Sequence, residues 1–374
     1  MPTETLLIVF FIVSLMQCGY AIFFFGRIFQ LPFQNKKTIL WKFPASIIIC
    51  AKNEAGNLAQ FLPLVLKQDY RNREGEYLYE VIVVNDESED ETSDILKQLQ
   101  AQYTHLKIVG IHKNELRKFK GKKQALSKGV AAASNIHLVF TDADCAPSNE
   151  HWLQNMMQPF FEEKEIVVGY GAYRFQKGFL NAFIQYETLH GFLQYATYTL
   201  AGKPFMAVGR NLACNKNMFL KAQQGELWNL LPSGDDDLLM RIVATKNNTA
   251  VTASCHTVSV AKQNWKDWFA QKQRHNSTGK HYKLLIKILL AGYAFSHALI
   301  WVLFITLLLT KFIKLVCLLM LLRCLLVWLP LVFLALKMKQ KKLIAWIPLL
   351  DFSWLIYNLA LSPFIFFKNK QTWK

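Results

Sequence analysis

Four long apolar stretches constrain this chain of 374 residues more than any other feature. They cover Thr5–Phe29 and, toward the other end, about Ile286–Thr310, Phe312–Leu336 and Leu343–Phe367. Each is roughly 20 residues or longer, which is enough to cross the hydrocarbon core of a bilayer. The opening Met-Pro-Thr-Glu-Thr carries no positive charge, so we expect the first stretch to stay as an anchor rather than to be cleaved. The pattern predicts an N-terminal anchor in residues 1–30 and about three membrane helices in residues 286–367.

Lysines and arginines flank these stretches, and they crowd the connection before the last one as Lys337, Lys339, Lys341 and Lys342. The positive-inside rule then places the large block between the first and second stretches in the cytoplasm. The basic tail of Lys368, Lys370 and Lys374 disagrees with four complete spans, so either the last stretch is re-entrant or interfacial, or the rule is broken there.

The net charge of +17 raises the question of a polyanionic partner. Anionic lipid head groups explain it more simply than nucleic acid, because the charges flank the apolar stretches and no motif with base-stacking aromatics accompanies them. We therefore expect membrane lipids and no nucleic acid as partners. The seven cysteines are scattered without any C-x-x-C pair, which fits a reducing compartment.

Short apolar runs alternate with helical patterns in the block between the stretches. The runs at Ser46–Cys50, Val81–Val84, Lys107–Ile111 and His137–Thr141 are expected to be strands, each separated from the next by a loop or a helix. This alternation predicts an α/β domain with a mostly parallel sheet covered on both faces. Ligands of such sheets bind outside the carboxyl ends of the strands.

Candidate polar residues follow the second and fourth of these strands, and another opens a helix. Asp142 and Asp144 are two positions apart after the fourth strand, so both side chains can reach one divalent cation, although a solvated turn is the simpler alternative. Asp86 and Ser88 can bond a base and a ribose, or can cap a helix. Lys122 opens a helix that can hold a diphosphate, or belongs to a solvated basic turn.

Three adjacent acids, Asp235 to Asp237, enter a later helix. One of them can act as a general base toward an acceptor hydroxyl, whereas the simpler alternative is capping of the helix. Farther along, Trp265, Trp268 and Phe269 lead into a basic segment near 262–279, which predicts an amphipathic helix at the membrane interface.

Taken in order, these segments resemble the inverting glycosyltransferases of family 2, which have the GT-A fold, over roughly Pro44 to Gly279. Ala51-Lys-Asn-Glu54 is similar to the first-strand loop of the family, and the loop at Asn85–Asp90 to its nucleotide loop, with Asn85 and Glu87 as departures. Gly121-Lys122, Asp142-Ala-Asp144 and Gly234-Asp235-Asp236 resemble its Gly-Lys, Asp-x-Asp and Glu-Asp elements. Gln271-x-x-Arg274 is similar to the Gln-x-x-Arg-Trp of polysaccharide synthases and ceramide glucosyltransferases, with His275 in place of Trp.

The resemblance implies a membrane-bound hexosyltransferase with a cytoplasmic GT-A domain in residues 44–279. It would move a sugar from a UDP- or GDP-sugar to a hydroxyl of a lipid-linked or glycan acceptor without processivity, in the bacterial cytoplasmic membrane. A small processive polysaccharide synthase and a catalytically silent scaffold are the alternatives.

The implied site residues fall into three sets. Mg²⁺ or Mn²⁺ would be held by Asp144 with Asp142, and the base would be Asp235, with Asp236 as the alternative. The residues expected to bind the nucleotide sugar are Glu54, Asp86, Ser88, Lys122, Asp142, Gln271 and Arg274.

Two charges fall inside the apolar stretches, Arg323 in the third and Asp351 in the fourth. An unpaired charge there costs about 2.5–3.5 kcal/mol on insertion scales. We expect both to face the interior of the helix bundle, toward each other or toward the phosphate of a lipid acceptor. The alternative is that they snorkel to the membrane surface.

Overall fold

The computed structural model describes residues 3–33, 42–231, 234–276 and 278–361, and it divides the chain into two compact units. The sheet unit contains residues 32–174 and 204–261, and the helical unit contains residues 1–31, 175–203 and 262–369. Lys36, Lys37 and the basic tail lie outside the described residues. The units interleave along the sequence, so the predicted division into 1–30, 44–279 and 286–367 stays a prediction.

Within the described residues, eight strands form one sheet in the order β3-β2-β1-β4-β7-β6-β8-β5. The first four strands are parallel to one another, and β7 turns antiparallel against β4 and β6. The sheet is therefore mixed, and its parallel part is the one predicted. The bounds are β1 (Ala45–Ala51), β2 (Tyr79–Asp86), β3 (Leu106–Ile111), β4 (His137–Asp142), β5 (Ala146–Pro147), β6 (Ile166–Tyr173), β7 (Leu212–Asn215) and β8 (Thr249–Ser259).

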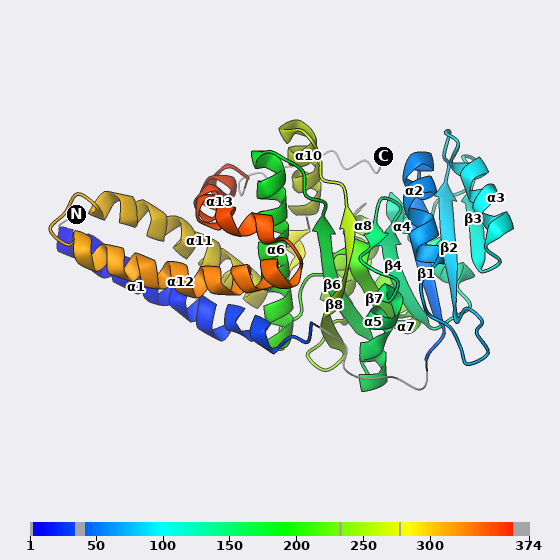
Figure 1. Ribbon diagram of the computed structural model, residues 1–374, viewed down its shortest axis with the longest axis horizontal. Helices are drawn as coiled ribbons and strands as arrows, with labels where there is room; N and C mark the ends of the chain where they lie inside the picture. The colour runs from blue at the N-terminus through cyan, green and yellow to red at the C-terminus, as the bar shows by residue number, and fades with distance from the viewer. Residues whose placement is uncertain (1–2, 34–41, 232–233, 277, 362–374) are drawn as a thin grey trace. The chain divides into compact units, whose positions relative to one another are not determined.

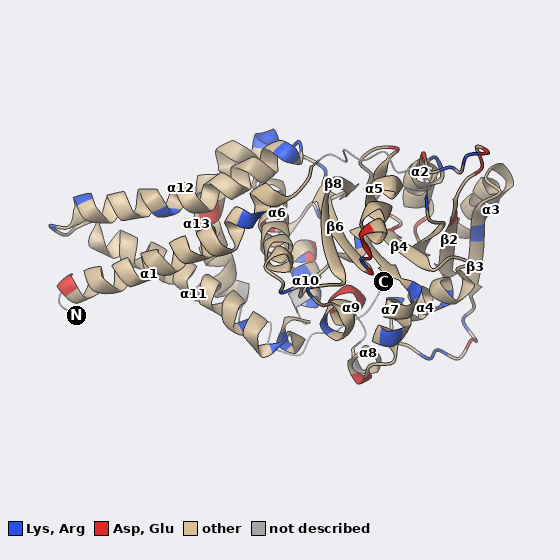
Figure 2. Ribbon diagram, turned by 90° about the horizontal axis from the view of Figure 1, so that it is seen from below, with Lys and Arg blue, Asp and Glu red and all other residues tan. Residues whose placement is uncertain are grey.

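The central parallel strands are buried along their whole length, which explains their unbroken apolar sequence. Every residue of β1, Ala-Ser-Ile-Ile-Ile-Cys-Ala, is buried, because helices cover both faces of the strand. One of these helices packs unusually close, since a Cβ at Gly129 of α4 would come within 2.7 Å of Ile48. The α-helices of this unit are α2 (Ala55–Leu66), α3 (Thr92–Gln102), α4 (Lys122–Ala132), α5 (Trp152–Met157), α7 (Lys216–Gln223), α8 (Glu226–Leu230) and α9 (Asp235–Val243). Figure 1 labels the first six of them, and Figure 2 labels α9.

The helical unit holds the apolar stretches. Among the described residues, four helical segments are long and apolar enough to cross a membrane: Thr3–Gln30, Leu284–Leu307, Ile313–Lys337 and Lys341–Ala360. They correspond to α1 (Thr3–Phe23) with a short 3-10 turn, α11 (Leu284–Leu307), α12 (Ile313–Lys337) and, after another 3-10 turn, α13 (Ile347–Leu361). The same unit contains α6 (Phe179–Leu200) and α10 (Trp265–Asn276), so the segment near 262–279 contains the predicted helix.

Arg323 of α12 and Asp351 of α13 form an ion pair inside this unit. The side chains are 0% and 1% exposed, so the prediction that they face the interior and each other is confirmed and the snorkelling alternative is wrong. Gln17 of α1 accepts from Arg323 Nη2 at 3.2 Å, while Tyr186 of α6 donates to Asp351 at 3.3 Å. His297 of α11 lies 3.1 Å from the same carboxylate. One buried charge pair therefore joins five helices.

Replacing Arg323 by methionine is expected to destabilise the helical unit, because the Asp351 carboxylate loses its cation while it stays buried. Breaking a buried pair from one side costs about 3–5 kcal/mol. Arg323→Met should lower the thermal unfolding midpoint in detergent, and Arg323→Met with Asp351→Asn should recover part of the loss. Leu325→Met on the exposed face of α12 is the control. An unchanged midpoint for the single variant would contradict the structural role of this pair.

Candidate active site at the ends of the parallel strands

The register of the parallel strands brings the predicted acidic loops to one edge of the sheet. Cys50 of β1 pairs with Asp142 of β4, and Ala51 pairs with Asn85 of β2. Asp142 and the loop after Asp86 therefore lie on opposite sides of the end of β1. This is the arrangement expected for a crevice at the carboxyl ends of parallel strands.

The loops after β1 and β2 are bonded to each other. The Ser88 hydroxyl accepts from the Asn53 backbone N–H at 2.9 Å, and the Asn53 side chain accepts from the Glu89 N–H at 2.8 Å. Asp90 accepts from the backbone N–H groups of Ala55 and Thr92, both at 3.1 Å. The Ser88 oxygen thus supports the loop, and Asp90 bonds the backbone at the first residues of α2 and α3.

Glu54, the last residue of the loop after β1, begins α2. Its carboxylate accepts from the Asn57 side chain at 2.5 Å, while its backbone N–H donates to the Thr92 hydroxyl at 2.9 Å. These bonds hold Glu54 beside the loop at Asn85–Asp90, which resembles the nucleotide loop of the family. Its role in binding, like that of Ser88, stays a prediction.

Asp86 lies at the end of β2 with a fully buried side chain. Both of its oxygens accept from the Arg117 guanidinium, which also pairs with Glu87 at 3.0 Å. Arg117 is 29% exposed, so the pair presents the guanidinium rather than the carboxylate to solvent. Sequence reasoning missed Arg117, because it stands in a basic segment with no spacing that marks it.

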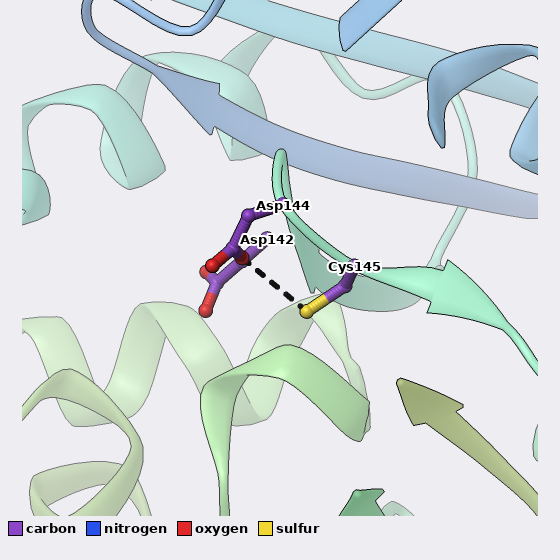
Figure 3. Close-up of side chains that lie close together, drawn as sticks. All are labelled: Asp142, Asp144 and Cys145. Carbon is purple, nitrogen blue, oxygen red and sulfur yellow. Dashed lines mark hydrogen bonds between the residues drawn. The ribbon is translucent and has the colours of Figure 1, made fainter. Parts of the chain in front are cut away.

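Asp142 and Asp144 lie side by side after β4, and their carboxylates point the same way (Figure 3). Asp142 forms an ion pair with Lys122, whereas Asp144 accepts from the Ser259 hydroxyl at 2.9 Å and from the Cys145 thiol at 3.4 Å. The two donors to Asp144 are neutral, so its negative charge is retained for a cation. Ser259, on β8, is far away in sequence and was not predicted.

These carboxylates fit a hard divalent cation. Asp142, Asp144 and Cys145 each place one ligand atom within 4.8 Å of the other two. Burial raises the pKa of the Cys145 thiol well above its usual range, and the two aspartates raise it further. The thiol therefore stays protonated and serves as a donor to Asp144. The oxygen ligands that Mg²⁺ or Mn²⁺ requires are those of the two aspartates.

The first turn of α9 contains three adjacent acids, Asp235 to Asp237, and Figure 2 draws acidic residues red. Asp235 and Asp236 line a pocket together with Lys122, Thr141 and Gly209, closed by the apolar side chains of Leu126, Phe140, Leu212, Phe219 and Leu239. Lys122 is thus the residue that faces both acid groups of the site.

The ammonium of Lys122 is held between Asp142 and the acids of α9. Burial lowers the pKa of Lys122, but Asp142 and then Asp235 outweigh this effect, so the pKa lies well above its usual range. Lys122 therefore stays positively charged at physiological pH. The alternative of a solvated basic turn does not describe this lysine, whose side chain is 22% exposed.

Asp235 and Asp236 differ in what they bond. Asp236 accepts from the backbone N–H of Gly209 and from that of Asp237, both at 2.9 Å. Burial and the neighbouring Asp235 raise the pKa of Asp236 to about 6. Asp236 therefore ties the start of α9 to the Gly209 turn, and Asp235 is the acid of α9 that acts more strongly on Lys122.

Arg210 supplies a second cation near Asp142 and Asp144. Its guanidinium donates to the Tyr173 hydroxyl at 3.1 Å and to the Gly171 carbonyl at 2.5 Å, and it lies 4.5 Å from the centre of the Tyr173 ring. A Cβ at Gly171 would come within 2.2 Å of Arg210 Nε, so only glycine leaves room for it. Burial lowers the pKa of Arg210, but Tyr173, Cys145 and both aspartates raise it more. This role was not predicted from the sequence.

Gln271 and Arg274 lie on α10 in the helical unit. Within that unit, Lys272 pairs with Glu187 of α6, and the nearly buried Trp268 packs edge-on against Phe183. The part predicted for Gln271 and Arg274 at the diphosphate stays a prediction.

Comparison with known proteins agrees with this geometry. The model of the family "Glycosyl transferase family 2" matches residues 46–221. These residues form a family 2 glycosyltransferase domain. The match contains all the strand ends described above except that of β8, together with Lys122 and Arg210.

Two curated relatives share part of this domain. Glycosyltransferase AglE of Haloferax volcanii is 33% identical over 109 residues, which is 29% of this chain and 33% of the relative. Beta-monoglucosyldiacylglycerol synthase of a Nostoc species is 27% identical over 158 residues, which is 42% of this chain and 31% of the relative. The chain thus spans about a third of the length of these relatives.

A solved structure is similar over almost the whole chain. Mannosyltransferase PcManGT of Pyrobaculum calidifontis, solved with GDP-Man and Mn²⁺, has a TM-score of 0.56 and 16% identity, covering 96% of this chain and 97% of its own. The likeness shows the fold, so the predicted GT-A fold is confirmed.

The raised pKa of Asp236 predicts a pH-dependent stability of the sheet unit. Between its usual pKa of 3.8 and about 6, the folded chain binds more protons than the unfolded chain, so stability falls as pH rises through this range. Asp236→Asn lacks this titration. The thermal midpoint of the natural protein, measured relative to that of Asp236→Asn, should fall by a few degrees from pH 4 to pH 6.5. The control is Asp94→Asn at an exposed position of α3. Parallel curves for the natural protein and Asp236→Asn would contradict the shift.

Proposed function

We propose that this protein is a membrane-bound glycosyltransferase that moves one sugar from a nucleoside-diphosphate sugar to a hydroxyl of a lipid-linked or glycan acceptor, with inversion. The observation that carries the proposal is the position of Lys122. Its ammonium contacts Asp142 and lines one pocket with Asp235 and Asp236. Lys122 and Asp142 lie inside the residues that match the family 2 model, and the two acids of α9 follow those residues in the sequence. A group that binds phosphate and a group that can remove a proton therefore face each other across one pocket.

The donor side of the site is built from Asp142, Asp144, Lys122 and Arg210. A divalent cation bound by Asp144 and Asp142 would neutralise the charge that develops on the diphosphate leaving group. Lys122 and Arg210 add two fixed positive charges beside these carboxylates. Arg117, at the exposed side of its pair with Asp86, is suited to contact the base or ribose through guanidinium donors. Glu54 and Ser88 hold the adjoining loops.

Asp235 is proposed as the general base. The carboxylate of Asp236 is already engaged by two backbone N–H groups, so its orientation is fixed toward the Gly209 turn. Asp235 would take the proton of the acceptor hydroxyl as the oxygen attacks the sugar carbon from the face opposite the diphosphate. A single displacement of this kind inverts the anomeric centre.

The acceptor is proposed to be apolar or tied to the membrane. In the part of the chain that the structure describes, four helical segments long enough to span a bilayer accompany the proposed catalytic domain. The Nostoc relative is named for a glucosyldiacylglycerol product, which is a membrane lipid. We place the sheet unit in the bacterial cytoplasm, because the basic residues next to the spans favour that side. Four spans are few for a polymer channel, which favours transfer of a single sugar.

The proposed roles predict that Asp144→Asn and Asp235→Asn abolish most transfer for different reasons. Loss of a carboxylate at Asp144 weakens Mn²⁺ binding, whereas loss at Asp235 leaves Mn²⁺ binding intact and slows the chemical step by about 10²–10⁴-fold. The measurement is nucleotide release by the purified full-length protein from a panel of UDP- and GDP-sugars with Mn²⁺, together with Mn²⁺ titration by calorimetry.

Asp94→Asn, which makes the same change at an exposed site, should behave as the natural protein. Full transfer by Asp235→Asn and its loss in Asp236→Asn would move the base to Asp236. Full transfer by both Asp144→Asn and Asp235→Asn would overturn the proposed chemistry. Donor binding without any transfer, by the natural protein across the panel, would favour a silent scaffold, and a ladder of products on a sizing gel would favour a processive synthase.

A further inference from the structure

Lys123, the neighbour of Lys122, is a fully buried lysine with specific partners. Its ammonium donates to the backbone carbonyl of Trp228 at 3.0 Å and to that of Leu231 at 2.6 Å. It also lies 5.0 Å from the centre of the Trp228 ring. The lysine of α4 thus satisfies carbonyl groups at the end of α8, where a helix leaves its last carbonyls without partners.

The segment to which Lys123 is hydrogen-bonded precedes the proposed base in the sequence. Leu231 is four positions before Asp235 in the sequence. The Trp228 side chain is buried edge-on against Phe219 at 5.3 Å, and a Cβ at Gly225, just before α8, would come within 2.7 Å of Ile242 on α9. The end of α8 is therefore fixed between α4 and the elements that carry and support Asp235.

Adjacent residues of a helix point about 100° apart, so one short sequence can serve two neighbours. Lys122 contacts Asp142 on the donor side, and Lys123 contacts the end of α8 on the side of α9. The first turn of α4 is thereby bonded both to the proposed metal site and to the segment that precedes the proposed base.

We propose that Lys123 is a positioning residue, which holds the segment before Asp235 so that this carboxylate lies at the correct distance from Lys122 and the donor. The inference rests on the proposed function of Asp235 as base. Lys123 does not line the pocket that Lys122 shares with Asp235 and Asp236, and its hydrogen bonds go to the backbone of the segment before the proposed base.

Burying the ammonium of Lys123 costs desolvation free energy. Burial lowers the pKa of Lys123 to about 8, with Asp235 and Asp236 acting in the opposite direction. An apolar side chain of the same length would avoid this cost of desolvation. The ammonium is therefore explained by its hydrogen bonds to the two carbonyl groups, which methionine cannot make.

The test compares Lys123→Met, which keeps the length of the side chain without the donor, with Lys123→Arg, which keeps charged donors. Lys128→Met, on the same helix in a surface pair with Glu115, is the matched control. The full-length protein is assayed for kcat and donor KM with Mn²⁺, for its thermal midpoint, and for hydrogen exchange of the backbone amides in residues 226–231 and 234–243.

Lys123→Met should lower kcat by about ten- to hundredfold, because small displacements of a catalytic group have effects of that size, while donor KM changes by less than about twofold. Amide exchange near α8 and the start of α9 should rise, and Lys123→Arg should restore part of kcat.

Three results would overturn the inference. The first is an unchanged kcat in Lys123→Met although its backbone amides exchange faster. The second is an equal loss of kcat and of donor binding that follows the fall in thermal midpoint. The third is a change in kcat no larger than that of Lys128→Met. If Asp235→Asn keeps full activity, the proposed base fails, and the exchange data then still report whether Lys123 holds this segment.

Discussion

The candidate site of the sheet unit depends on one partly buried cation, Lys122, which is shared by two groups of acids. Lys122 forms an ion pair with Asp142 and lines a pocket with Asp235 and Asp236, which come from a different part of the sequence. Without a positive charge there, the carboxylates that follow β4 and those that open α9 would repel each other across the pocket. The ammonium allows the proposed metal-binding pair and the proposed base to be close together, and the proposed displacement at a sugar carbon requires this closeness.

The helical unit uses the same principle in an apolar setting. Arg323 and Asp351 neutralise each other, and Gln17, Tyr186 and His297 complete their hydrogen bonds. Each of these five residues comes from a different helix. One of the five helices, α6, is too polar for its sequence to mark it as a membrane span. A buried ion pair adds little stability compared with apolar packing, but it fixes which helices are neighbours. The pair therefore specifies the arrangement of this unit more than it strengthens it.

The features that could be predicted from the sequence are those determined by residues close together along the chain. The strands at β1, β2 and β4 are apolar runs that end at polar residues, so their shared edge follows from parallel pairing. The proximity of Asp142 to Asp144 follows from their spacing of two positions in the sequence. Arg117, Arg210 and Ser259 were not predicted, because each reaches its partner through a contact distant in sequence. Gly171 shows the difficulty well. Its role is to leave space for Arg210, 39 positions away, and nothing in its neighbours along the chain indicates that.

The two lysines that open α4 show why residue type alone does not assign a role. Lys122 and Lys123 are identical and adjacent, and both are buried to a large extent, yet their pKa values are shifted in opposite directions. Carboxylates lie near Lys122, and their effect on its pKa outweighs that of burial. Backbone carbonyls accept the hydrogen bonds of Lys123, and the effect of burial on its pKa prevails. A carbonyl is a dipole and a carboxylate is a charge, so the same ammonium becomes a fixed charge in one place and a structural donor in the other. The chemistry of the crevice therefore follows from what each lysine faces, which only the fold determines.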